Sequence, residues 1–125
     1  MSDKLPFISV VMPVRNEERF ISKTLEQIIS QDYPEKRFEV LVVDGMSVDG
    51  TREIVRRYQR EHERIRILEN PKRLSSAGRN LGFRHGKGNV FVVIDGHCFI
   101  PTDQLFKNIL NLWCHYGRQP RRREL

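Results

Sequence analysis

The chain has 125 residues, of which 38% are hydrophobic and 30% charged, and this length suits a single compact domain. It is too apolar for a disordered chain, and its longest apolar runs, about five residues, fall far short of the roughly 20 that cross a bilayer, which excludes an integral membrane protein. The net charge is +6, but four arginines and one glutamate in residues 117–125 supply +3 of it, so the rest of the chain is only mildly basic and no nucleic-acid partner is expected.

The N-terminus carries no sign of export. Residues 1–6 lack the apolar stretch of a secretory signal, so we expect a cytoplasmic protein. A mildly basic surface also suits peripheral contact with anionic headgroups at the inner face of the membrane. Cys98 and Cys114 have no second pair to complete a zinc site, and a reducing compartment disfavours a disulfide, so both are expected to be free thiols.

The first half of the chain predicts two strands, each followed by a helix. The apolar runs at 7–12 and 38–43 have the β-branched composition of strands. Between them the spacing changes to that of a helix with one apolar stripe, which consists of Phe20, Ile21, Thr24, Leu25, Ile28 and Ile29. Asp49 is a good N-cap residue and predicts the start of a second helix that runs through Ile54, Val55 and Tyr58.

The second half repeats this order. Residues 65–68 form a short alternating run, which favours an edge strand, and a weaker helix is expected over about 75–84. The run at 90–94, like that at 38–43, is almost continuously apolar, which is typical of strands covered on both faces. A last helix follows, with its apolar stripe formed by Leu105, Phe106, Ile109, Leu110 and Trp113.

Four strand-helix units predict an α/β fold with a parallel four-stranded sheet, helices on both faces and the strand order 3-2-1-4. In such a sheet, ligands bind beyond the carboxyl ends of the strands. Asp44 and Asp95 each end an apolar run, so both are expected at this edge. Each could instead be a plain turn former, and Asp49 is most simply a helix cap.

The first turn lacks the glycine-rich signature of a Rossmann dinucleotide site. It carries Glu17 and Glu18 at the start of the helix, where carboxylates would repel a phosphate. A diphosphate at this edge would therefore need another source of positive charge. A divalent cation held by Asp95 and its neighbours is the natural candidate.

Four segments in order resemble the successive motifs of the family 2 inverting glycosyltransferases. They are residues 9–18 (SVVMPVRNEE), 42–51 (VVDGMSVDGT), 77–82 (AGRNLG) and 95–97 (DGH), and the similarity covers about residues 7–116. The resemblance implies a Rossmann-like GT-A half with a donor site for a nucleotide-diphosphate sugar of UDP or GDP type. It also implies Mn²⁺ or Mg²⁺ at an Asp-x-Asp-type motif, and transfer to a glycan, polysaccharide or lipid-linked acceptor.

The resemblance also assigns roles to individual residues. Those that would line the nucleoside pocket are Pro13, Val14, Asn16 and Glu17, with Asp44 beside the base and ribose. Arg79 and Asn80 match a segment near the diphosphate, although Arg79 could be only a solvent-exposed charge. Asp95 and His97 match the metal motif. Two residues depart from the family pattern: Gly45 stands where a second acid is common, and His97 stands where an aspartate is usual, although imidazole can ligate Mn²⁺.

The C-terminal part contains no candidate for the catalytic base. An inverting transferase needs a carboxylate to take the acceptor's proton, and in the family this base lies in an acceptor-binding half well beyond the metal motif. Only 28 residues follow His97. We therefore expect a donor-binding domain over 7–116 and an Arg-rich tail over 117–125, with the hypothesis that the reading frame is truncated or shifted near Gly117. The alternative for the tail is a basic terminus that touches anionic lipid or nucleic acid.

Two functions thus remain open from the sequence. One is a family 2 glycosyltransferase domain, and the alternative is a catalytically incomplete module that binds nucleotide sugars or a partner. Either way, we expect the strand at 90–94 to have an unpaired edge, and Leu112 and Trp113 to lose cover. Self-association follows as a prediction.

Overall fold

The computed structural model describes residues 5–117, with side chains described as far as Leu112. In chain order the elements are β1 (Ile8–Val14), α1 (Ile21–Ile29), the 3-10 helix η2 (Glu35–Arg37), β2 (Phe38–Asp44), α2 (Thr51–Glu61), β3 (Ile65–Glu69), α3 (Ser75–His85), β4 (Val90–Val93) and α4 (Leu105–Gly117). All the strands and helices expected from the sequence are present, and η2 is an addition to them.

The four strands form one parallel sheet in the order β3-β2-β1-β4. β1 pairs with β2 from Ile8 opposite Phe38 to Val14 opposite Asp44, and with β4 from Ile8 opposite Val90 to Val11 opposite Val93. The predicted α/β fold, strand order and edge position of β3 are confirmed. Because all strands run the same way, their carboxyl ends lie at one edge of the sheet.

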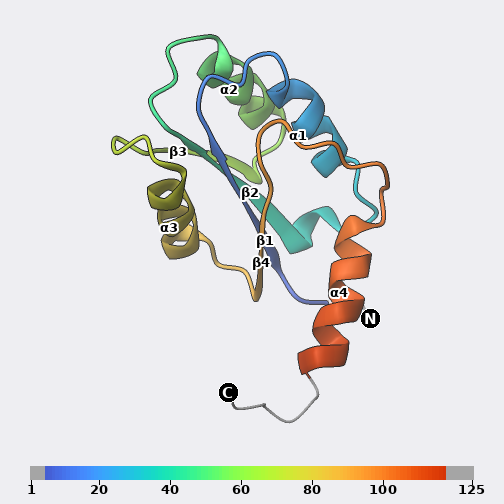
Figure 1. Cartoon of the computed structure of the whole chain (residues 1–125). Coiled ribbons are helices and arrows are strands. Elements are labelled where there is room, and N and C mark those ends of the chain that lie inside the picture. Colours follow the sequence, from blue (N-terminus) through green and yellow to red (C-terminus); the bar gives the residue numbers. More distant parts are fainter. Residues whose placement is uncertain (1–4, 118–125) are drawn as a thin grey trace.

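Helices cover the two faces of the sheet unequally (Figure 1). The larger core lies under α1, α2 and α4, where Ile21, Leu25, Val55 and Phe106 pack on alternate residues of β1 and β2. On the other face, α3 is the one helix among the described residues, and it covers a smaller cluster formed by Val11, Leu41 and Val43, with Leu68 and Leu81 against it. Side chains of β1 and β2 alternate between these two cores, as the two-residue period of a strand requires.

Close packing of α3 on the sheet depends on two buried glycines. A Cβ atom on Gly82 would lie 2.3 Å from Cγ1 of Val11, and one on Gly78 would lie 3.3 Å from Cβ of Pro13. Larger residues would force the helix outward. The first turn of α3 is thereby held beside the end of β1.

A buried polar cluster ties the entry of β4 to the sheet. The carboxylate of Glu39, which is 3% exposed, accepts hydrogen bonds from the Ser9 hydroxyl at 2.6 Å and from the Lys87 amide at 2.9 Å. The Gly88 amide donates to Ser9 Oγ at 2.8 Å, and Arg66 pairs with Glu39 at 3.3 Å. Both oxygens of the Glu39 carboxylate and the hydroxyl oxygen of Ser9 thus have partners, as burial of a charge requires.

Two expectations about coverage are wrong. β4 was expected to be covered on both faces, but Phe91 and Val93 are 36% and 41% exposed. Helix α3 lies over β1 and β2, and it reaches β4 through the edge contact between Phe83 and Phe91. Phe20 was expected in the apolar stripe of α1, but it precedes the helix and is 50% exposed.

Within residues 5–117, no helix is long and apolar enough to cross a membrane. Leu112 is exposed, as expected. The side chains of Trp113 and Cys114, and the Arg-rich tail after Gly117, lie outside what the structure describes.

Candidate functional site

The ends of β1, β2 and β4 bring the predicted polar residues to one edge of the sheet. Asp44 is the last residue of β2, paired with Val14 of β1, and Asp95 follows β4 on the other side of β1. The prediction that both carboxylates lie at this edge is confirmed, and they lie on opposite sides of β1.

Asp44 is fully buried, and its carboxylate is held by neighbours of its own chain segment. Its Oδ1 accepts a 2.5 Å hydrogen bond from the Ser47 hydroxyl, and its Oδ2 accepts one from the Ser47 amide at 3.1 Å. Arg52 Nε lies 3.5 Å from Oδ2, while the same guanidinium pairs with Glu69 at 2.8 Å. This geometry makes Asp44 an anchor for the loop after β2.

Ser47 also connects the loops that follow β1 and β2. Its Oγ accepts a hydrogen bond from the Asn16 amide at 2.8 Å, and Asn16 Oδ1 accepts one from the Val48 amide at 2.9 Å. Arg15 donates to the Gly45 carbonyl at 2.7 Å. Asn16 has a φ of 53°, a left-handed conformation that asparagine tolerates better than most residues. The two loops therefore form one polar unit.

Further bonds extend this unit to the start of α2. The Glu17 amide donates to Thr51 Oγ1 at 2.8 Å, and the Gly50 amide donates to Glu18 Oε1. Asp49 accepts hydrogen bonds from the Thr51 amide at 3.0 Å and the Thr51 hydroxyl at 2.6 Å. Desolvation acts to raise the pKa of Asp49, but the bonds from Thr51 and Glu18 outweigh it and lower the pKa. The expectation that Asp49 is the N-cap of this helix is wrong, because Gly50 occupies that position and Asp49 lies one residue earlier, where it bonds the first helical residue Thr51.

His97 and Glu17 join the end of β4 to the end of β1. His97 Nδ1 lies 2.9 Å from Glu17 Oε2. The hydrogen bond to this carboxylate, together with its charge, raises the pKa of His97. Gly96 is buried against Val14, where an added Cβ would lie 2.8 Å from Cγ1 of the valine. Only a glycine lets the turn after β4 approach β1 so closely.

Asp95 and His97 were predicted to hold a divalent cation. Within the described residues, no three side chains form a metal-binding group, so Asp95 and His97 would supply part of a coordination shell. Both residues are exposed at the carboxyl edge. The Glu17 contact at Nδ1 leaves Nε2 of His97 available, and carboxylate-oriented imidazoles of this kind are common in metal sites. The donor set therefore fits a cation whose remaining ligands come from a bound diphosphate.

The other predicted residues are divided between two places. Pro13 and Val14 end β1 and belong to the same edge, where Pro13 contacts the first turn of α3. Arg79 and Asn80 lie on α3, where Arg79 Nη1 is 3.4 Å from Ser75 Oγ and Asn80 lines a cavity beside the β3–α3 connection. Within residues 5–112, no contact joins either side chain to Asp95 or His97, so their role at the diphosphate stays a prediction.

Three residues of the site were not predicted from the sequence. Ser47, Thr51 and Arg52 hold the two loops and the Asp44 carboxylate in place. A serine three residues after an aspartate is a turn signal that could have indicated the Asp44–Ser47 bond. Nothing local could have indicated that Thr51 binds the amide of Glu17, 34 residues earlier.

Comparison with known proteins identifies the family of this chain. The sequence model described as Glycosyl transferase family 2 matches residues 9–119. The chain is 42% identical over 99 residues to Glycosyltransferase AglE of Haloferax volcanii, an alignment that covers 78% of the chain and 33% of the relative. It is 37% identical over 105 residues to the dolichyl N-acetyl-alpha-D-glucosaminyl phosphate 3-beta-D-2,3-diacetamido-2,3-dideoxy-beta-D-glucuronosyltransferase of Methanococcus voltae, covering 82% and 33%.

A solved structure shares the fold. The mannosyltransferase PcManGT from Pyrobaculum calidifontis, in complex with GDP-Man and Mn²⁺, superimposes with a TM-score of 0.82 at 30% identity. The match covers 90% of this chain and 33% of the mannosyltransferase. The chain thus spans about a third of the length of the relatives it matches.

Proposed function

The chain belongs to glycosyltransferase family 2, and from this premise we propose that it binds a nucleotide-diphosphate sugar, together with a divalent cation, as the donor for sugar transfer. The observation that supports the proposal most is the polar unit at the carboxyl edge. There, contacts between residues far apart in the chain join Asn16 to Ser47 and Glu17 to His97, and Asp95 lies two residues before His97.

In this proposal, the loop after β1 receives the nucleoside. Pro13, Val14, Asn16 and Glu17 line its pocket, and Asp44 acts through Ser47, since the buried carboxylate holds the loop that faces the base and ribose. Preorganisation of this kind lowers the entropy lost when a ligand binds. Gly45 offers no side chain toward the base, so the choice between UDP and GDP rests with other residues of the two loops.

The same proposal puts the diphosphate beside the turn after β4. Asp95 and His97 would hold Mn²⁺ or Mg²⁺, and Arg79 and Asn80 would approach the phosphates from α3. A cation bound there offsets the negative charge of the leaving nucleotide diphosphate. Glu17 orients the His97 ring and accepts the hydrogen bond at Nδ1. The Mn²⁺ and GDP-Man named for the mannosyltransferase structure support this arrangement.

The acceptor is a glycan, a polysaccharide or a lipid-linked sugar in this account. The relative from Methanococcus voltae, whose name specifies a dolichyl-linked phosphate, supports the lipid-linked case, and with it contact at the inner face of a membrane. We assign no catalytic base to residues 5–112. Proton transfer from the acceptor is therefore the one step that the proposal does not give to this part of the chain.

Calorimetry tests the donor proposal directly. UDP and GDP are titrated into the chain with and without Mn²⁺, and the proposal expects one of the two to bind, with affinity that rises when Mn²⁺ is present. Absence of binding for both would overturn the proposal. A donor-hydrolysis assay then distinguishes a transferase domain from the alternative, a module that binds nucleotide sugars without turning them over.

A further inference from the structure

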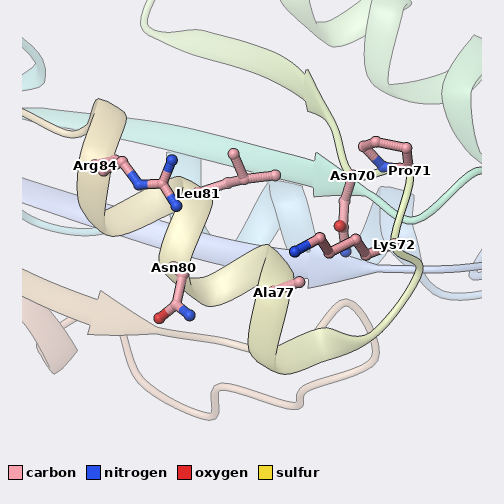
Figure 2. Close-up of a pocket in the computed structure, with 7 residues that line it drawn as sticks. All are labelled: Asn70, Pro71, Lys72, Ala77, Asn80, Leu81 and Arg84. Atoms are coloured by element: carbon pink, nitrogen blue, oxygen red, sulfur yellow. The ribbon is translucent and has the colours of Figure 1, made fainter.

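The helices on the two faces of the sheet meet the carboxyl edge differently. Next to α3 lies a cavity that Asn70 and Asn80 help to line (Figure 2). It belongs to the donor edge, because the Asn70 amide donates to the Asp44 carbonyl at 2.8 Å. Helix α1, on the opposite face, instead binds the connection between β4 and α4 directly. The segment that carries Asp95 and His97 is therefore held from the side of α1.

Two polar side chains of α1 bind the first half of this connection. Thr24 is 1% exposed, and its Oγ1 donates to the Gly96 carbonyl at 2.7 Å, the shortest of the three contacts that this hydroxyl makes with carbonyl oxygens. Gln27 Nε2 donates to the Cys98 carbonyl at 3.0 Å, and its Oε1 accepts a bond from the Ile100 amide at 2.7 Å. Residues three apart on a helix lie on the same face, so the two side chains act on one stretch of backbone.

Asp95 and His97 lie in one tight turn of that backbone. The Cys98 amide donates to the Asp95 carbonyl at 3.2 Å, which is the bond between the first and fourth residues of a β-turn, with Gly96 and His97 at its centre. The Gly96 carbonyl, to which Thr24 donates, belongs to the peptide group that joins Gly96 to His97. The hydroxyl of Thr24 thus fixes the peptide plane between the two candidate cation ligands.

The same peptide is also confined from the side of β1. An added Cβ on Gly96 would lie 2.8 Å from Cγ1 of Val14 and 3.2 Å from Cγ of Glu17. The Glu17 carboxylate holds the His97 ring at Nδ1. The turn is therefore held between two elements, with its backbone bound by α1 and its histidine ring oriented by the loop after β1.

We propose that Thr24, assisted by Gln27, is a positioning residue for the divalent cation, an inference that rests on the proposed function. Neither side chain is a ligand of the cation in this account. They hold the turn so that Asp95 and His97 extend from one fixed backbone, which lowers the entropy lost when the cation binds. Loss of the Thr24 hydroxyl removes this restraint and weakens the binding of the cation more than that of the nucleotide.

Thr24→Val tests the proposal, because it removes the hydroxyl and keeps the β-branched shape. UDP and GDP are titrated by calorimetry with and without Mn²⁺, and the readout is the ratio of the two affinities for the nucleotide that the wild type binds. We expect Thr24→Val to lower this ratio about tenfold or more, as is typical when a group that orients a metal ligand is lost. The affinity without Mn²⁺ should stay unchanged. Thr24→Ser retains the hydroxyl and should restore the ratio.

Gln31→Met is the matched control for a purely structural role. Gln31 is 5% exposed and binds the far end of the same connection, where it donates to the Thr102 carbonyl at 2.8 Å and accepts from the Phe106 amide at 3.0 Å. Both Gln31→Met and Thr24→Val leave buried backbone groups without a partner, so both should lower the melting temperature. Only Thr24→Val should lower the Mn²⁺ ratio. An equal loss of the ratio in the two variants would mean that Thr24 acts through stability alone.

Gln27→Met gives a second test at a partly exposed position, where the fold tolerates substitution better. It should lower the Mn²⁺ ratio in the same direction as Thr24→Val. An unchanged ratio in either variant, with Mn²⁺ still enhancing binding in the wild type, would overturn this inference and leave the proposed function standing. Absence of any Mn²⁺ enhancement in the wild type would instead overturn the proposed cation site, and this inference with it.

Discussion

His97 Nδ1 lies 2.9 Å from Glu17 Oε2, a contact that joins the ends of β4 and β1 across 80 positions of sequence. The carboxylate favours the protonated imidazole and raises the pKa of His97. Because the pKa is raised in the folded state, the pair stabilises the fold most at low pH, and this contribution is lost as the pH rises through the folded-state value.

Glu17→Gln should therefore lower the pKa of His97 toward its usual range. NMR titration of the His97 ring protons measures this change directly. Glu18→Gln is the matched control, since Glu18 bonds the Gly50 amide instead and should leave the His97 titration in place. If Glu17→Gln left the titration midpoint of His97 unmoved, this would contradict the contact between the two side chains.

Ser47→Ala should destabilise the domain by about 1–3 kcal/mol, because the change leaves the buried Asp44 carboxylate and the Asn16 amide without their shared partner. Urea unfolding followed by circular dichroism gives the free energy of unfolding. Ser76→Ala, at an exposed position of α3, is the control and should have an effect of about 0.5 kcal/mol or less. Equal effects of the two substitutions would mean that Ser47 does not hold the loops together.

Gly82→Ala should also destabilise the domain, by about 1–3 kcal/mol, despite the better helix propensity of alanine. Its Cβ would lie 2.3 Å from Cγ1 of Val11, so α3 would have to move away from the sheet. Val11→Ala removes the atoms in the way, and the double variant should be more stable than the sum of the two single changes predicts. Strict additivity in the unfolding free energies would contradict this packing.

Strand and helix positions followed from sequence because the apolar residues of β1, β2 and α1 keep the periods of the elements they form. The same reasoning located Asp44 and Asp95, since a polar residue that ends a buried strand must lie at the edge of the sheet. Coverage of β4 could not be predicted this way. Its sequence matches a strand buried on both faces, but the exposure of Phe91 and Val93 depends on how far α3 extends across the sheet.

The hydrogen bonds that connect the loops of the site also could not be predicted from the sequence. Ser47 accepts a bond from the amide of Asn16, 31 positions away, and its hydroxyl could as well have faced water. Likewise, the pairing of His97 with Glu17 could not be distinguished beforehand from a direct contact between His97 and Asp95. Both depend on how closely the loops after β1, β2 and β4 approach one another, and this approach depends on Gly96 and on the conformation of Asn16.

β4 pairs with β1 alone among the described strands, and its exposed face carries Phe91 and Val93. An uncharged, half-exposed edge strand can pair with a strand of another chain, so we expect self-association at protein concentrations of about tens of micromolar. Val93→Lys should reduce it, whereas the control Val48→Lys, at a valine that is 84% exposed in the loop after β2, should not. Light scattering measures the effect, and a monodisperse wild-type monomer at this concentration would contradict the expectation.

The most direct test of the donor site is the Mn²⁺ dependence of nucleotide-diphosphate binding in Asp95→Ala, measured by calorimetry. Asp95 is exposed after β4, so its loss should leave the fold intact while it removes the Mn²⁺-dependent part of the affinity. His97→Ala should weaken this part less, and the control Asp103→Ala, at another exposed aspartate after β4, should retain it. Unchanged Mn²⁺-linked affinity in Asp95→Ala would contradict the assignment of the donor site to this edge of the sheet.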